Sequence, residues 1–76
     1  MKSVKIPPQE FEPLLSLKSS GMWQLAHEKA EELNEKYPNN ISVLIVLAEI
    51  CTTLGDFLTA ARYNNQALAI IPNDPG

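Results

Sequence analysis

Apolar side chains recur every three or four residues in this chain, within four segments separated by turn-forming stretches. Each of those stretches contains glycine or proline, and they are Pro7-Pro8 and residues 19–21, 37–40, 54–56 and 72–76. A spacing of three and four is typical of one face of an α-helix. No segment alternates with a period of two, and no Asn-Gly or Asp-Gly hairpin turn occurs. The pattern therefore predicts four helices and an all-α fold.

The second, third and fourth helices are predicted over residues 22–36, 41–53 and 57–70. Asn40 and Asp56 are suited to cap the third and fourth helices, because their side-chain oxygens can accept hydrogen bonds from free backbone amides. Gly55 suits a left-handed helix end. One stripe of each helix is expected to face the core: Trp23, Ala26, Ala30, Leu33 and Tyr37 in the second, Leu44, Leu47, Ala48 and Cys51 in the third, and Phe57, Ala60, Ala61, Asn64, Ala67 and Leu68 in the fourth.

The first helix is expected to begin between residues 10 and 12 and to end at Ser19. A start at Pro8 would place Pro13 inside the helix, where its ring clashes with the carbonyl group four residues earlier. Proline is tolerated in the first turn of a helix, which favours the later start. Residues 1–6 are expected to form an N-terminal arm.

Identical residues recur thirty-four positions apart in this chain. The pairs are Gly21 and Gly55, Ala26 and Ala60, Pro38 and Pro72, and Asn39 and Asn73, and the aromatic residues Trp23 and Phe57 have the same offset. A fixed period of this length is typical of proteins built from stacked helical repeats.

At these positions the chain resembles the tetratricopeptide repeat (TPR) family. The family pattern is W-x2-L-G-x2-Y in the first helix of a repeat, then A-x3-F and a final proline in the second. The first helix of the first unit departs from it, because Glu10 and Pro13 stand where large apolar residues are usual. The second unit matches through Leu44, Leu47, Ala48, Cys51, Ala60, Asn64 and Pro72, and the first through Leu14, Leu17, Ala26, Ala30 and Pro38.

The resemblance implies an all-α, right-handed array of antiparallel helix pairs with four helices, a TPR-like superhelix. Residues 7–40 would form the first repeat and residues 41–74 the second. Residues 75–76 would be a C-terminal end that is truncated or leads into further repeats. Stacked repeats cover one another's apolar faces, and about three are usual.

The resemblance also implies a concave groove, formed by the first helix of each repeat, that binds a peptide or helix of a partner protein. The matching residues are Phe11, Leu15, Lys18, Ser42, Ile45, Glu49 and Thr52, with Val46 as a further candidate. Packing between the repeats is an equally good interpretation of the apolar ones. The clamp with which some TPR domains hold a peptide's carboxylate is not expected, because Phe11, Leu15 and Val46 offer no side-chain donor there.

Reactive or metal-binding chemistry is not indicated by any motif. His27 is expected to pair with Glu31, and Cys51 is expected to be a small buried apolar side chain. One Cys and one His do not suffice for a structural zinc site, and the glutamate-rich stretch 28–35 is interpreted as a solvated helix face. We therefore expect no enzyme activity, no cofactor and no metal.

Composition limits the partners. The chain has 76 residues and a net charge of −3. An acidic balance argues against nucleic acid and against an anionic membrane surface. The longest apolar run, residues 43–48, is too short to span a bilayer, and no signal-peptide pattern follows the first lysines. We expect a cytoplasmic protein.

The predicted function is therefore a non-catalytic protein–protein interaction module, a scaffold or adaptor. The alternatives are the N-terminal helical portion of a longer enzyme or secretion-system component, and an assembly chaperone. Self-association as a homodimer is also expected, because the fourth helix carries a single charge, Arg62. The residues expected to be most exposed there are Leu58, Tyr63 and Ile70, together with Ile45.

Overall fold

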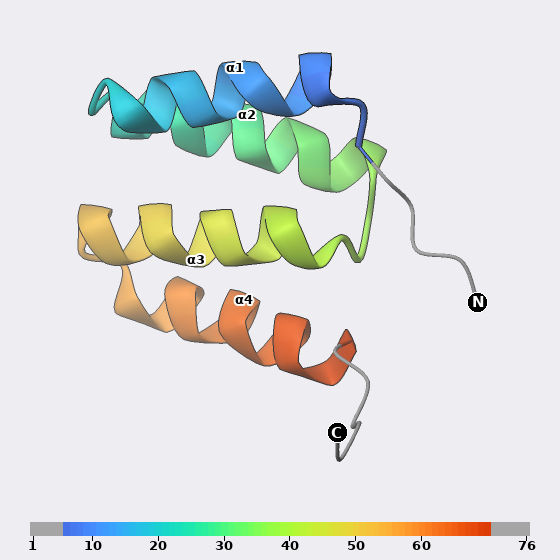
Figure 1. Ribbon diagram of the computed structural model, residues 1–76. Helices are drawn as coiled ribbons and strands as arrows, with labels where there is room; N and C mark the ends of the chain where they lie inside the picture. Colours follow the sequence, from blue (N-terminus) through green and yellow to red (C-terminus); the bar gives the residue numbers. More distant parts are fainter. Residues whose placement is uncertain (1–5, 71–76) are drawn as a thin grey trace, which may run out of the picture.

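The computed structural model describes residues 6–70, which form four α-helices (Figure 1). These are α1 (Pro8–Ser19), α2 (Trp23–Lys36), α3 (Ile41–Leu54) and α4 (Phe57–Ile70). No strand occurs between residues 6 and 70, so the predicted all-α class is confirmed for this part of the chain. The expectations for residues 1–5 and 71–76, including the stop at Pro72, lie outside the described residues.

Each of the first three helices packs mainly against the helix that follows it in the chain, and α4 packs against α3. The helices lie side by side in the order α1, α2, α3, α4, and successive helices run in opposite directions (Figure 1). Contact is most extensive between α3 and α4. As a result α2 and α3 each have a helical neighbour on two sides, whereas α1 and α4 stand at the ends of the array.

The ends of α3 form as the sequence predicts. The Asn40 side chain accepts a hydrogen bond from the Val43 amide at 3.2 Å. At the other end Gly55 adopts a φ of 88°, a left-handed conformation that a residue with a Cβ rarely takes. Asp56 then caps α4, because its carboxylate accepts from the Thr59 amide at 3.3 Å. The turn at Gly55 therefore closes one helix and positions the next.

The predicted start of α1 is wrong, because the helix begins at Pro8. The carbonyl of Pro7 accepts hydrogen bonds from the amides of Glu10 and Phe11, at 2.9 and 3.2 Å, which closes the first turn. Pro8 needs no donor in this turn. Pro13 consequently lies inside the helix, on its exposed side. The Pro13 ring and its missing amide hydrogen destabilise α1. Contacts of the buried face of the helix have to offset this loss of stability.

The main cluster of buried apolar side chains comes from α1, α2 and α3, and α4 adds Ala60 and Ala67 to the core. The predicted stripes of α2 and α3 are confirmed for their helical positions, apart from Trp23, which is only half-buried. Val46 is 7% exposed and belongs to the core, so its predicted place in a groove is wrong. Ile6, expected in the arm, is half-buried against the same cluster, whose buried members are Leu14, Ala26, Ala30, Leu33, Val43, Val46, Leu47 and Ile50.

The predicted inner stripe of α4 is right for only two of its six residues. Ala60 and Ala67 are buried, but the other four of its residues, Phe57, Ala61, Asn64 and Leu68, are exposed. Tyr63 instead packs against the core, and Ile70 is half-buried, so the expectation that these two are among the most exposed is wrong. The physical reason is that, among the residues that the structure describes, α4 packs extensively against α3 alone.

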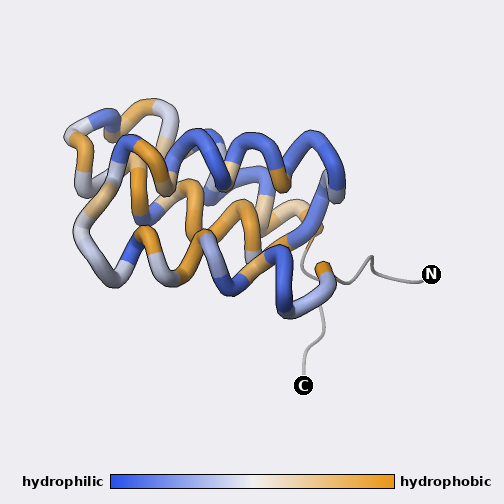
Figure 2. Tube along the Cα trace, turned by 90° about the horizontal axis from the view of Figure 1, so that it is seen from above, coloured by the Kyte–Doolittle hydropathy of each residue, from blue (hydrophilic) through white to orange (hydrophobic). Residues whose placement is uncertain are grey.

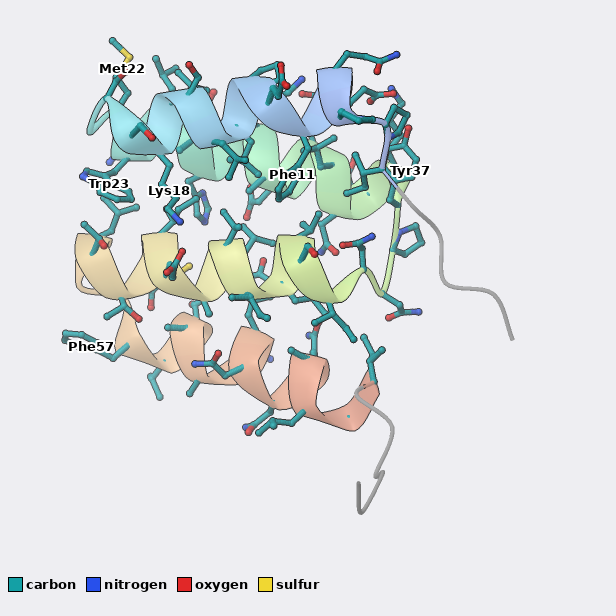
Figure 3. All side chains as sticks on the ribbon, viewed as in Figure 1. Phe11, Lys18, Met22, Trp23, Tyr37 and Phe57 are labelled. Carbon is teal, nitrogen blue, oxygen red and sulfur yellow. The ribbon has the colours of Figure 1, made fainter. Side chains whose placement is uncertain are left out.

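Polar side chains also join α1 to the end of α2. Glu10 accepts hydrogen bonds from Lys36 Nζ at 2.9 Å and from Tyr37 Oη at 2.8 Å. Figure 3 shows Tyr37 beside the first turn of α1. These two hydrogen bonds hold the pKa of Glu10 below its ordinary value of 4.5, and the one from Lys36 has the larger effect. On the outside of α2, hydrophilic residues prevail (Figure 2).

We expect the substitution Glu10→Gln to lower the melting temperature at neutral pH. A depressed pKa in the folded state contributes stability above the ordinary pKa, and this contribution is lost as pH falls through the folded value. The difference between the two proteins should therefore shrink as the pH falls below 4.5, the ordinary pKa of the Glu10 carboxyl group. Thermal unfolding followed by circular dichroism measures it, with Glu12→Gln as the control in the same helix. A difference independent of pH would contradict the assignment.

The second prediction concerns the contact between α3 and α4. Ala60 is 4% exposed, so Ala60→Leu has to force three additional carbon atoms into a packed contact. We expect it to lower the free energy of unfolding by about 1–3 kcal/mol. The exposed Ala69 supplies the control, because Ala69→Leu should change stability by less than about 0.5 kcal/mol. Urea denaturation of both variants measures the free energy of unfolding. Equal losses in the two variants would contradict the close packing of Ala60 against α3.

Candidate binding groove

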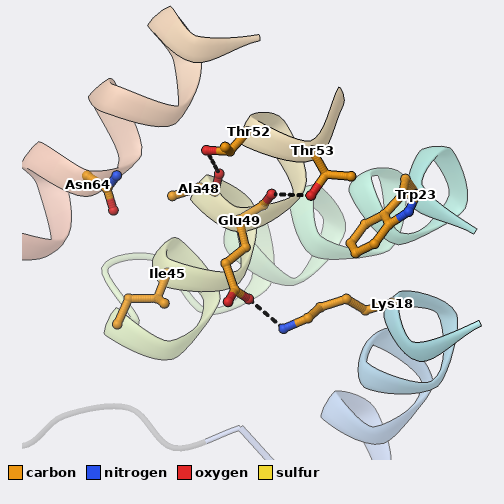
Figure 4. Close-up of a pocket in the computed structure, with 8 residues that line it drawn as sticks. All are labelled: Lys18, Trp23, Ile45, Ala48, Glu49, Thr52, Thr53 and Asn64. Atoms are coloured by element: carbon orange, nitrogen blue, oxygen red, sulfur yellow. Dashed lines mark hydrogen bonds and ion pairs between the residues drawn. The ribbon is translucent and has the colours of Figure 1, made fainter. Parts of the chain in front are cut away.

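An open groove lies along one face of α3 and is lined by residues from all four helices (Figure 4). Its volume is about 360 Å³. One residue each comes from α1, α2 and α4, and the rest come from α3. The lining residues are Lys18, Trp23, Ile45, Ala48, Glu49, Thr52, Thr53 and Asn64. Because the helices are antiparallel, the C-terminal part of α1 and the N-terminus of α2 lie beside α3 at this place (Figure 3).

Four of the seven predicted groove residues meet in this groove, namely Lys18, Ile45, Glu49 and Thr52. The other three do not line it. Phe11 is half-buried against the core, which fits the interpretation of packing between helices. Leu15 and Ser42 are exposed elsewhere on α1 and α3.

Four further lining residues are absent from the predicted set: Trp23, Ala48, Thr53 and Asn64. Trp23 and Asn64 were assigned to core stripes by their spacing, but each lies at the edge of its helix's buried face. Trp23 could have been placed in the groove from the antiparallel order of the helices, because this order brings the start of α2 next to the end of α3. Spacing within one helix carries no such information.

The two charged residues in the groove neutralise each other. Lys18 Nζ donates a hydrogen bond to Glu49 Oε1, and this ion pair links α1 to α3 (Figure 4). Two hydroxyl groups are also engaged within α3, because Thr52 donates to the Ala48 carbonyl at 2.8 Å and Thr53 to the Glu49 carbonyl at 3.0 Å. The groove is therefore mainly a shaped surface, with no net charge of its own.

Apolar surface in the groove comes from the Trp23 ring and from Ile45, whose side chain is 45% exposed. Asn64 adds an amide at the α4 edge, able to donate and to accept hydrogen bonds. These groups can hold an apolar side chain together with polar groups of a neighbouring backbone. They are suited to recognition rather than to proton or group transfer.

Candidate reactive residues lie away from the groove lining. His27 Nε2 is 3.6 Å from Glu31 Oε2 on the same helix, which agrees with the predicted pairing. Cys51 is buried, and burial raises the pKa of its thiol. Within residues 6–70, no group of three or more His, Cys, Asp or Glu side chains could hold a metal ion.

A second, shallower depression lies between α1 and α2. Its lining residues are Leu17, Leu25, Glu28, Lys29 and Glu32. Leu25 is 51% exposed, close to the 45% of Ile45. This makes Leu25 a matched site for control substitutions outside the groove.

Comparisons with protein-family models, curated protein sequences and solved structures found no match to this chain. In the part of the chain that the structure describes, no helix combines the length and the apolar composition that a membrane span requires.

The Lys18–Glu49 pair can be measured by a double-mutant cycle. Because both side chains are partly exposed to water, we expect a coupling energy of about 0.2–1 kcal/mol in the free energy of unfolding. The coupling should weaken as salt is raised, since salt screens partly exposed charges. A cycle of Lys18→Ala with Glu35→Ala serves as the control and should be additive. Additivity of Lys18→Ala with Glu49→Ala would contradict the pairing.

Proposed function

We propose that this chain is a non-catalytic protein–protein interaction module of the TPR type, which binds a peptide or helix of a partner protein in the groove. The observation that carries the proposal is the lining of the groove. It joins exposed apolar groups, a neutralised ion pair and one amide from four different helices. A surface of this kind offers shape and hydrogen bonding to a polypeptide.

The positions of the helices support the repeat organisation. The bounds of α2 and α4 differ by thirty-four residues at both ends. Gly21 and Gly55 have the same offset and both have a positive φ, of 78° and 88°. An organisation into residues 7–40 and 41–74, with a right-handed stacking of helix pairs, accounts for these equivalences.

The groove suits an apolar anchor residue in a ligand that is otherwise neutral. The anchor would contact Ile45 and the Trp23 ring, and Asn64 would meet a backbone amide or carbonyl. Lys18 is occupied by Glu49, so a free terminal carboxylate is not the preferred ligand. We further propose a cytoplasmic location, because a single cysteine cannot form the internal disulfides that small secreted domains commonly use. The same groove would serve an assembly chaperone or a helical portion of a longer protein.

We expect selection from a random peptide display library to yield ligands with an apolar anchor. Trp23 is the only tryptophan and lines the groove, so binding should change its fluorescence. Ile45→Gln should weaken binding of a selected peptide by about tenfold or more, the effect of removing one apolar anchor contact. Fluorescence titration measures both effects.

Leu25→Gln is the matched control, because Leu25 has a similar exposure outside the groove. It should leave both the melting temperature and the peptide affinity close to those of the unaltered chain. Selection of no peptide, or equal loss of affinity in the two variants, would overturn the assignment of the groove.

A further inference from the structure

The two ends of the helical array differ in the chemistry of their outer faces. On α1, the outer positions Gln9, Glu12, Pro13 and Ser16 are exposed. Their counterparts thirty-four residues later, Val43, Val46, Leu47 and Ile50, are buried in the core. α1 therefore carries polar residues and a proline where α3 carries large apolar ones, so it is suited to terminate the array.

The opposite end has no such polar face. Phe57, Leu58 and Leu68 on α4 are 66%, 83% and 67% exposed, and Ala61 between them is exposed as well. Figure 3 shows the Phe57 side chain at the N-terminal end of α4, projecting outward beyond the first turn of the helix. Three large apolar side chains so exposed on one 14-residue helix indicate an interface.

The α2 helix shows how the equivalent face is treated within this molecule. Trp23, His27, Ala30 and Asn34 precede Phe57, Ala61, Asn64 and Leu68 by thirty-four residues, and all four are buried or half-buried. α2 has helices on both sides, whereas within residues 6–70 only α3 packs extensively against α4. The face on α4 is thus of the kind that another helix covers.

The spacing of this face is symmetric. Phe57, Ala61, Asn64 and Leu68 are separated by four, three and four residues, the spacing of a seam between two paired helices. Reversal of the helix leaves the pattern unchanged. An antiparallel copy therefore places Phe57 opposite Leu68 of the second copy, so that each large apolar side chain meets another. In the middle of the seam, Ala61 of one copy lies opposite the Asn64 amide of the other.

Charge does not oppose a second copy as the partner. Arg62 is the only charged residue of α4 and lies off the seam, so two copies can approach without repulsion between like charges along it. A head-to-tail arrangement would instead bring the apolar face of α4 against Gln9, Glu12 and Ser16 of α1. It would bury three polar side chains, one of them charged, whereas the two-fold arrangement brings only the Asn64 amide of each copy into the seam.

We infer that a second copy of this chain covers α4 in an antiparallel, two-fold symmetric dimer, with Phe57, Leu58, Ala61 and Leu68 as its apolar contacts. The choice of the seam residues rests on the repeat organisation proposed above. The exposure of these side chains is a separate observation that does not depend on that proposal. A seam along one helix is smaller than a standard interface of about 1,600 Å², so the dimer should dissociate on dilution.

Sedimentation equilibrium of the whole chain tests the association. We expect a mass of two chains at high concentration and of one chain on dilution. Leu68→Glu should weaken the dimer by about tenfold or more, because it places a charge in the apolar seam. Leu25→Glu, at an exposed leucine of α2, should leave it unchanged. A single-chain mass at every concentration, or equal effects of the two substitutions, would overturn the proposal.

Disulfide trapping tests the antiparallel register. Positions 57 and 68 are separated by roughly 16 Å along a helix, and a disulfide requires Cα atoms within about 7 Å. A mixture of Phe57→Cys and Leu68→Cys chains should therefore form the mixed disulfide, and neither variant should form one with itself to a comparable extent. Dominant self-linked products would overturn the register.

Failure of the dimer and failure of the groove are distinguishable. Leu68→Glu should still bind groove peptides, and Ile45→Gln should still dimerise. If selected peptides bind without any self-association, the groove stands and the α4 proposal is overturned. A third outcome is that the selected peptides lose affinity for the Leu68→Glu variant and keep it for the Ile45→Gln variant. The peptides would then bind to α4 itself, which also overturns the second copy as the occupant of that face.

Discussion

The burial of α3 between α2 and α4 is the contact on which the rest of the structure depends. Isolated helices of this length are marginal in water, so their stability has to come from packing. α3 buries seven residues, more than any other helix, and it carries one charged residue, Glu49. The neighbouring helices α2 and α4 then need only one apolar face each to pack against α3. The groove follows from the same packing, because five of its eight lining residues belong to α3.

The order of helices and their ends could be predicted because they depend on local chemistry. Asn40, Gly55 and Asp56 act through hydrogen bonds and backbone angles within a few residues, which a sequence states directly. Pro13 was misjudged because a local cost was weighed without its tertiary compensation. Glu10, one turn earlier, is tied to the end of α2 by two hydrogen bonds, which no pattern within residues 8–19 could indicate.

The buried face of α4 was misjudged for a different reason. Apolar spacing in this helix marks two faces, one through Ala60, Tyr63 and Ala67 and one through Phe57, Ala61 and Leu68. Both faces are suited to packing, and only the number of neighbouring helices decides which is covered. Only four of the eight groove residues could be predicted, because the others depend on how the helices are arranged in space. Lys18 and Glu49 meet across thirty-one residues of sequence, and Trp23 joins them only through the antiparallel turn after α1.

The groove and the apolar seam meet at one residue, and this relates the two proposals physically. Asn64 lines the groove from α4 and occupies the third position of the seam. A second copy would place its Ala61 opposite Asn64 and so restrict the amide that faces a groove ligand. It would also hold two grooves at a fixed separation. A ligand with two anchor segments would then bind the second groove at a high effective concentration, provided that its linker spans the distance. The affinity of each groove can therefore be modest without preventing stable capture.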